Sequence, residues 1–163
     1  MCAENNLQTK HHYMSRILTA EECLSYYQGC CEISPSEAKQ DILQFPKVSI
    51  LIITYNNLLM SQLCLRSIYC NTTYLNFEVI VVDNASTDET PDWLRTYAKT
   101  HPNLKIILNP DNRGFAAGNN QSAREATGEY IIFLNNDTIV TQGWIERLIK
   151  HMQNDPKIGL VGP

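Results

Sequence analysis

Short apolar runs alternate with amphipathic stretches from Lys47 onward, and this alternation limits the fold more than any other feature. The apolar runs have strand length, and we expect strands at Val48–Ile53, Phe77–Val82, Leu104–Leu108 and Tyr130–Leu134, with a fifth beginning at Ile158–Val161. The stretches between them repeat apolar residues at helical spacing, which predicts helices at Leu58–Cys70, Glu89–Lys99, Phe115–Ala126 and Gly143–Gln153. Strands that alternate with helices are joined by right-handed crossovers, so the pattern predicts an α/β domain with a mostly parallel sheet flanked by helices.

The starts of two of these helices carry capping signals. Ser86 and Glu89 have the spacing of a capping box, and Pro91 suits the first turn that follows. Asp88 is expected in that first turn, as a partner of the helix dipole. Asn57 stands where a capping residue for the helix at Leu58 would stand.

The first 46 residues are polar and irregular in comparison. One helix is expected over Ala20–Glu32, with Thr19 as its cap and Glu22 as the capping-box partner. We therefore expect two regions: residues 1–46 as a peripheral N-terminal extension, partly helical or disordered, and residues 47–163 as the folded domain.

Composition excludes several function classes. The net charge is -4 and the sequence has no Lys/Arg-rich run, so nucleic acid is not an expected partner. The six cysteines form no C-x-x-C pair, which favours reduced thiols and a cytoplasmic setting. The apolar runs are far shorter than the ~20 residues that span a bilayer, and the N-terminus lacks the apolar core of a secretory signal, so no transmembrane segment is expected.

Polar residues follow the expected strands, at the sheet edge where ligands of parallel sheets bind. Thr54, Tyr55 and Asn56 follow the first strand and offer a hydroxyl, an aromatic face and an amide, as a nucleotide pocket needs. Taken alone they are read better as an Asn-rich turn. Asp83 follows the second strand, where its carboxylate can bind an imide N–H or a ribose hydroxyl, or brace the loop, and the two roles are equally favoured.

Two further segments complete the set of candidates. Asp137, in the segment Asn135-Asn136-Asp137 after a buried fourth strand, offers a hard oxygen ligand for Mg²⁺ or Mn²⁺. The alternative is a polar turn without a ligand, because Asn, Asp and Thr are also typical turn residues. The segment from Asn109 to Asn120 has glycines and alanines at a helix start, which let a ligand or a strand approach closely. Its Arg113 is either a phosphate ligand or a solvent-exposed side chain. This segment is neither a Walker A loop nor a G-x-G-x-x-G fingerprint.

Taken together, four segments resemble the family 2 glycosyltransferases. They are VSILIITYNN, FEVIVVDNASTDET, NRGFAAGNN and GEYIIFLNNDT, in the order and at the spacing of that family. The trailing GWIERLIKHMQNDPKIGLVGP resembles the family's next helix and strand, so the resemblance covers about residues 48–163. It is closest to the branch that acts on cell-surface polysaccharides, including rhamnosyltransferase-like members. The implied fold is GT-A, a Rossmann-like sheet.

The resemblance implies roles for individual residues. The strand end at Thr54 would line the nucleotide pocket, Asp83 would bind uracil or thymine, and Gly114–Asn120 would border the nucleoside and the donor sugar. Asn135-Asn136-Asp137 would be the D-x-D motif, with Asp137 as the metal ligand and Asn135 in place of the usual first aspartate. The implied donor-binding residues are Thr54, Tyr55, Asn56, Asp83, Asn84, Arg113, Gly114, Asn119, Asn135 and Asn136.

The implied activity is inverting transfer of a hexosyl or deoxyhexosyl group from a UDP- or dTDP-sugar to a saccharide or lipid-linked acceptor. It would depend on Mg²⁺ or Mn²⁺ and serve polysaccharide, glycoconjugate or cell-wall synthesis. In the family the general base follows the equivalent of Pro163, so we expect this chain to be the donor-binding part, truncated before the acceptor half and inactive alone. The full-length enzyme would be cytoplasmic, with peripheral association at the inner face of the plasma membrane. The alternative is a non-catalytic nucleotide-binding or structural module.

Overall fold

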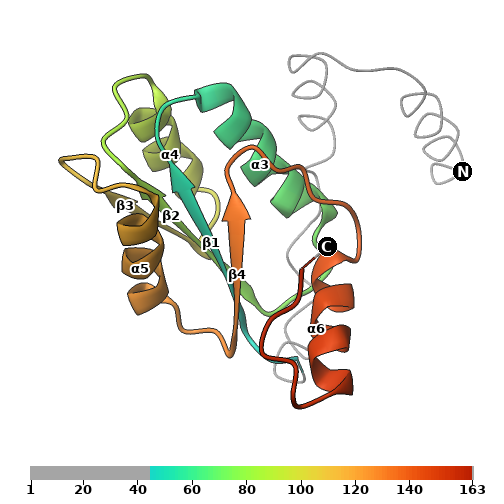
Figure 1. Cartoon of the computed structure of the whole chain (residues 1–163). Helices are drawn as coiled ribbons and strands as arrows, with labels where there is room; N and C mark the ends of the chain where they lie inside the picture. Colours follow the sequence, from blue (N-terminus) through green and yellow to red (C-terminus); the bar gives the residue numbers. More distant parts are fainter. Residues whose placement is uncertain (1–44, 163) are drawn as a thin grey trace, which may run out of the picture.

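Four parallel strands form the sheet, in the order β3-β2-β1-β4. A computed structural model of the protein describes residues 45–162 (Figure 1). The strands are β1 (Val48–Thr54), β2 (Phe77–Asp83), β3 (Leu104–Leu108) and β4 (Tyr130–Asn135). The helices are α3 (Leu58–Asn71), α4 (Thr90–Ala98), α5 (Phe115–Glu125) and α6 (Trp144–Asn154). The predicted α/β class and parallel sheet are confirmed.

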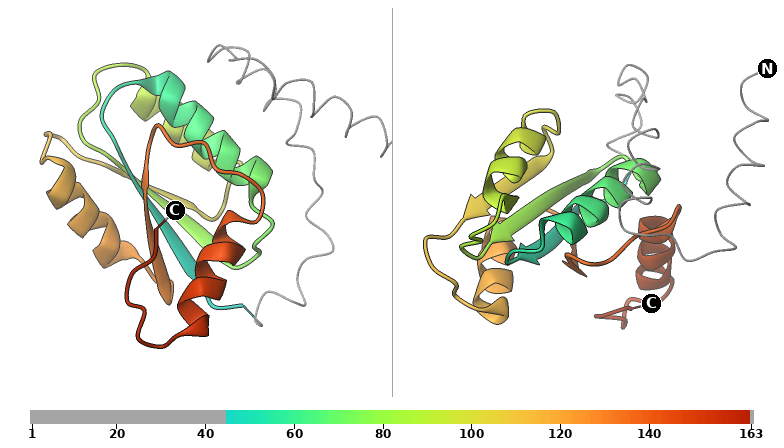
Figure 2. Two further views of the ribbon diagram at one scale, coloured as in Figure 1. Left: turned by 45° about the vertical axis from the view of Figure 1, so that its right-hand side comes forward. Right: turned by 90° about the horizontal axis from the view of Figure 1, so that it is seen from above.

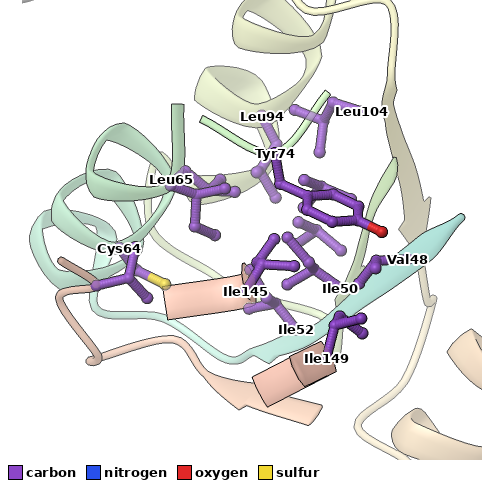
Figure 3. Close-up of a cluster of buried hydrophobic side chains, with 14 residues drawn as sticks. Val48, Ile50, Ile52, Cys64, Leu65, Tyr74, Leu94, Leu104, Ile145 and Ile149 are labelled. Atoms are coloured by element: carbon purple, nitrogen blue, oxygen red, sulfur yellow. The ribbon is translucent and has the colours of Figure 1, made fainter. Parts of the chain in front are cut away.

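Helices cover both faces of the sheet, as the views in Figure 2 show. One face of β1 packs with side chains of α3, α4 and α6 into the main hydrophobic cluster, to which Ile50, Leu65 and Ile145 belong (Figure 3). Cys64 is part of this cluster as well. On the opposite face α5 packs against β1 and β2. Each fully buried Ile or Leu contributes about 1.5–3 kcal/mol to folding, so this cluster is the main source of stability.

β4 differs from the other long strands because it lies at the edge of the sheet. Tyr130, Ile132 and Leu134 pack on the main cluster. Ile131 and Phe133 point to the opposite face, where they remain 44% and 58% exposed. The expectation of a buried fourth strand was therefore wrong, because its residues alternate between half-buried and exposed: α5 packs against β1 and β2 and leaves this strand open.

The amino-terminal end of the sheet is held by one carboxylate. Glu78 of β2 accepts hydrogen bonds from the Ser49 hydroxyl (2.6 Å), the Lys47 ammonium (2.9 Å) and both the backbone N–H and the hydroxyl of Thr127 (2.8 and 2.9 Å). Beside it, the backbone N–H of Gly128 donates to Ser49 Oγ (2.8 Å). Glu78 thus ties β1 and β2 to the connection that leads from α5 into β4.

Several sequence expectations need correction. Residues 158–161 form no strand. The capping box is absent, because Ser86 Oγ donates to Asp83 instead and the N-cap residue of α4, Glu89, makes no side-chain capping bond. Asn57 also lies at an N-cap without a side-chain capping bond. Asp88 precedes α4, while Pro91 is in its first turn as expected.

The expected helix Ala20–Glu32 and almost all of the N-terminal extension lie outside the described residues. Within residues 45–162, no helix combines the length and the apolarity that crossing a membrane requires.

Candidate functional site

The carboxyl ends of three strands meet at one edge of the sheet. Thr54 pairs in register with Asp83, and Ile53 pairs with Asn135. The strands are parallel, so the loops that follow them emerge side by side, as the arrowheads of β1 and β4 show in Figure 1. The sequence-predicted residues after the first, second and fourth strands are therefore brought together.

The loops after β1 and β2 are joined by hydrogen bonds. The Asn84 N–H donates to the Thr54 carbonyl (2.8 Å), and the Asn56 N–H donates to Ser86 Oγ (2.6 Å). In the reverse direction, the Thr87 N–H donates to Asn56 Oδ1 (2.7 Å). The two loops therefore form one braced unit rather than two independent turns.

This bracing holds an unfavourable backbone. Asn56, Asn57 and Ala85 adopt the left-handed conformation, with φ of 56°, 60° and 65°. A left-handed L-residue other than glycine costs on the order of 1–2 kcal/mol, less for Asn than for Ala. Tyr55 precedes the two asparagines and is left 51% exposed at the edge of the sheet.

Asp83 faces inward in this arrangement. The residue is 1% exposed, and its carboxylate accepts hydrogen bonds from the Ser86 N–H (3.0 Å) and from Ser86 Oγ. The loop-bracing role, one of the two roles open from the sequence, is thus present in the structure. A carboxylate can accept further hydrogen bonds, but a base reaches this one only if the loop around Ser86 moves. Base binding by Asp83 stays a prediction.

Asn84 is also committed to internal bonds, in a network of buried and half-buried amides. Its Nδ2 donates to the Gly114 carbonyl (3.1 Å), and its Oδ1 accepts from Asn109 Nδ2 (2.9 Å). Asn109 and Gln121 exchange two further bonds, of 2.9 and 3.0 Å. The network connects the ends of β2 and β3 to α5. No role was assigned to Asn109 or Gln121 from the sequence, although Asn109 could have been recognised because it directly follows a strand.

The start of α5 explains the glycines of the segment from Asn109 to Asn120. Gly114 has a φ of 79°, which favours glycine. At Gly118, an added Cβ would stand 3.2 Å from the Ile53 side chain, so this glycine lets the helix approach the sheet closely. Asn119 Nδ2 donates to the Phe115 carbonyl (3.1 Å) within the helix. Arg113 is exposed, with its Nε 3.5 Å from Asp111.

The turn after β4 presents one carboxylate to solvent. Asn136 points inward, where its Nδ2 lies 3.2 Å from Ser61 Oγ and 3.4 Å from Thr54 Oγ1, themselves a buried hydrogen-bonded pair (2.8 Å). Asn135 and Asp137 are exposed. No group of three His, Cys, Asp or Glu side chains that could enclose a metal ion occurs among residues 45–162. The donor set fits an open site, in which a carboxylate and a carboxamide hold a Mg²⁺ or Mn²⁺ whose other ligands are water and phosphate oxygens.

A hollow of about 240 Å³ lies at the opposite end of the sheet. Two lysines line it, and both are already paired: Lys47 with Glu78, and Lys105 with Glu125. Its lysines offer no unpaired charge to an anion, so we assign no ligand to it.

The fold places the protein among the GT-A glycosyltransferases. A solved structure of the mannosyltransferase PcManGT from Pyrobaculum calidifontis, in complex with GDP-Man and Mn²⁺, aligns with a TM-score of 0.66 and 31% identity, over 84% of this chain and 41% of that chain. S. aureus TarS 1–349 in complex with UDP-GlcNAc aligns with a TM-score of 0.61 and 24% identity, over 72% of this chain and 37% of that chain, which is a likeness of fold alone.

The sequence assigns the family. The profile described as Glycosyl transferase family 2 matches residues 49–163, and the chain belongs to this family. Glycosyltransferase AglE of Haloferax volcanii is 33% identical over 103 residues, 63% of this chain and 34% of that protein. An uncharacterized glycosyltransferase of Haemophilus influenzae is 32% identical over 117 residues, 72% of this chain and 36% of that protein. The chain thus spans about a third of the length of these relatives.

Proposed function

We propose that this chain is the donor-binding part of an inverting glycosyltransferase that uses a nucleotide sugar and a divalent metal ion. The observation that carries the proposal is the meeting of three strand ends at one edge, with the exposed Tyr55 on one loop and the exposed Asp137 on another. The mannosyltransferase with GDP-Man and Mn²⁺ supports it, because it shares both the fold and about a third of the aligned residues.

The residues divide into ligand-facing and bracing groups in this proposal. The exposed Tyr55 offers an aromatic face to the nucleoside, and Asp137, with Asn135, would hold the metal ion. Arg113 is exposed at the start of α5 and would approach the diphosphate once released from Asp111. Thr54 and most other inward-facing members of the predicted set would hold the loops in shape, while Asp83 would bind the pyrimidine base once the loop around Ser86 moves. A bound Mg²⁺ or Mn²⁺ would offset the negative charge that develops on the leaving diphosphate.

The finer specificity belongs to the proposal as well. We propose a UDP- or dTDP-sugar as donor, a hexosyl or deoxyhexosyl group as cargo, and a saccharide or lipid-linked acceptor in polysaccharide or glycoconjugate synthesis. The setting would be the cytoplasm, at the inner face of the plasma membrane. We assign no described residue to the general base, and we propose that residues 1–163 alone bind the donor without transferring sugar.

The metal hypothesis is tested by the coupling between metal and nucleotide. A single carboxylate cannot hold Mn²⁺ tightly, so we expect weak Mn²⁺ binding to the free protein and stronger binding when UDP is present. By linkage, Mn²⁺ must tighten UDP by the same factor. Asp137→Ala should abolish this coupling and leave metal-free UDP binding nearly unchanged. Asn135→Asp should strengthen the coupling, because it adds a second charge beside Asp137.

Calorimetric titrations of UDP with and without Mn²⁺ measure the coupling. Asp92→Ala is the matched control, because Asp92 is an exposed carboxylate on α4 that pairs with Arg95. A charged contact is worth roughly 1.5–3 kcal/mol. In the presence of Mn²⁺, Asp137→Ala should therefore lower the affinity for UDP by about ten- to a hundredfold. Retained coupling in Asp137→Ala would remove this residue from the metal site.

Donor discrimination tests the nucleotide part. UDP and dTDP should bind more tightly than GDP and ADP, and equal affinities would refute the pyrimidine preference.

The alternative, a structural module, draws support from the internal bonds of Asp83 and Asn84. Absence of binding by all four nucleotides would favour it, whereas sugar transfer by residues 1–163 would show that the general base lies within this chain.

A further inference from the structure

The carboxylate of Asp88 lies between the starts of two helices. Its Oδ2 accepts the backbone N–H of Leu58 (3.1 Å), the first residue of α3, and its Oδ1 accepts that of Thr90 (3.0 Å), the first residue of α4. The N-cap residues of these helices, Asn57 and Glu89, make no side-chain capping bonds of their own. One side chain therefore caps both helices.

The charge of Asp88 suits this position. Burial raises the pKa of its carboxyl, but hydrogen bonds from Thr90 and the backbone N–H of Leu58 outweigh burial and lower it below the usual value. Asp88 is therefore ionised at neutral pH. The amino-terminal ends of two helices, each carrying partial positive charge, stabilise the same anion. No acidic residue stands in the first turn of α3, so Asp88 supplies that charge from the neighbouring loop.

The bond to Leu58 fixes the far end of the loop that carries Tyr55. This loop runs from the buried Thr54 to Leu58 and contains the two left-handed residues, Asn56 and Asn57. Its middle is held by Ser86 and Thr87 through Asn56, and its end is held by Asp88. All three braces come from the loop after β2, and Asp88 is the only charged one.

We propose that Asp88 is a positioning residue for nucleotide binding: it holds Tyr55 and Asn56 in their binding arrangement from the adjacent loop, without touching the ligand. The proposal rests on the proposed function, in which this loop lines the nucleotide site. Asp88 acts through the left-handed backbone at Asn56 and Asn57, which relaxes when the charged cap is lost.

The test combines a loss with a rescue. Asp88→Asn keeps the size of the side chain but loses the charge and one acceptor, and we expect UDP affinity in the presence of Mn²⁺ to fall about tenfold by calorimetry. Asn57→Gly should restore most of that loss in the double variant, because glycine adopts the left-handed conformation without strain. Asn57→Gly alone should change affinity less than about twofold. The matched control is Asp92→Asn, another acidic residue at the start of α4, which binds neither loop and should leave affinity unchanged.

Amide hydrogen exchange measures how firmly the loop at residues 55–58 is held when no ligand is present. Faster exchange at residues 55–58 in Asp88→Asn, reversed by Asn57→Gly, would support the proposal. Unchanged exchange in Asp88→Asn, or lost affinity that Asn57→Gly leaves unrestored while circular dichroism shows a folded protein, would overturn it. A wild-type chain that binds no nucleotide refutes the proposed function, and the exchange measurement then still decides whether Asp88 braces the loop.

Discussion

Glu78 should make the stability of the protein depend on acidity between pH 4.5 and 2. Burial alone would raise the pKa of this carboxyl, but the hydrogen bonds from Ser49, Thr127 and Lys47 outweigh it and lower the pKa from 4.5 to about 2. The folded protein thus binds a proton at Glu78 less readily than the unfolded chain does. The stabilisation is therefore complete above pH 4.5 and is lost as the pH falls toward 2.

The size of the effect follows from the shift. Each pKa unit corresponds to 1.36 kcal/mol, so the shift is worth at most about 3.4 kcal/mol, of which about 2 kcal/mol would be lost by pH 3. The side chain is 18% exposed and its lysine partner is more open, so screening by solvent reduces these figures to about half. We therefore expect about 1 kcal/mol of the contribution of Glu78 to disappear between pH 7 and pH 3.

Glu78→Gln isolates this contribution, because glutamine does not titrate. Urea denaturation at several pH values should show the wild type more stable than Glu78→Gln at pH 7, with the difference shrinking by about 1 kcal/mol at pH 3. Glu129→Gln serves as the control, since Glu129 is an exposed glutamate in the same connection between α5 and β4. Parallel stability curves for the wild type and Glu78→Gln would refute the reasoning.

Two further predictions concern packing. Gly128→Ala should lower the free energy of unfolding by about 2–3 kcal/mol, because the new Cβ would stand 2.6 Å from the backbone nitrogen of Ser49. Thermal melts should show this loss. The control Gly159→Ala should not change stability, because its Cβ would meet nothing within 4 Å. Cys64 should resist alkylating reagents at pH 8 until the protein unfolds, because burial raises the pKa of its thiol to about 12. Peptide mass spectrometry locates the label, and rapid labelling of Cys64 in the folded protein would contradict this prediction.

The sequence predicted the helices and strands better than it predicted the position of each strand in the sheet. The runs ILII at residues 50–53 and VIVV at residues 79–82 are apolar without interruption because β1 and β2 are central strands, covered on both faces. YIIFLN is also an apolar run, yet β4 lies at the edge of the sheet. The sequence of one strand does not reveal its position in the sheet. The apolar residues at 158–161 form no strand, because a strand requires a neighbour to supply hydrogen bonds and none of the four strands pairs with them.

The convergence of the candidate residues was predictable, but the direction in which their side chains point was less so. Parallel strands place their carboxyl ends together, so the convergence of Thr54, Asp83 and Asn135 followed from topology alone. The inward turn of Asp83 did not, because it depends on the path of the loop through Ser86. The same path explains the missing capping box: Ser86 has the right spacing to Glu89, but its hydroxyl is already bound by Asp83.

The outer edge of β4, unpaired among residues 45–162, should favour association of this chain with itself. An edge strand presents a row of unpaired backbone N–H and C=O groups, and natural proteins protect such edges with lysine, proline or a covering element. The segment YIIFLN has neither lysine nor proline, and no strand among residues 45–162 pairs with its outer side. Two chains that meet along β4 can extend each other's sheet, with Ile131 and Phe133 adding apolar contact. Self-association should therefore rise with protein concentration, and a charge at position 133 would act as a gatekeeper at little cost to the fold.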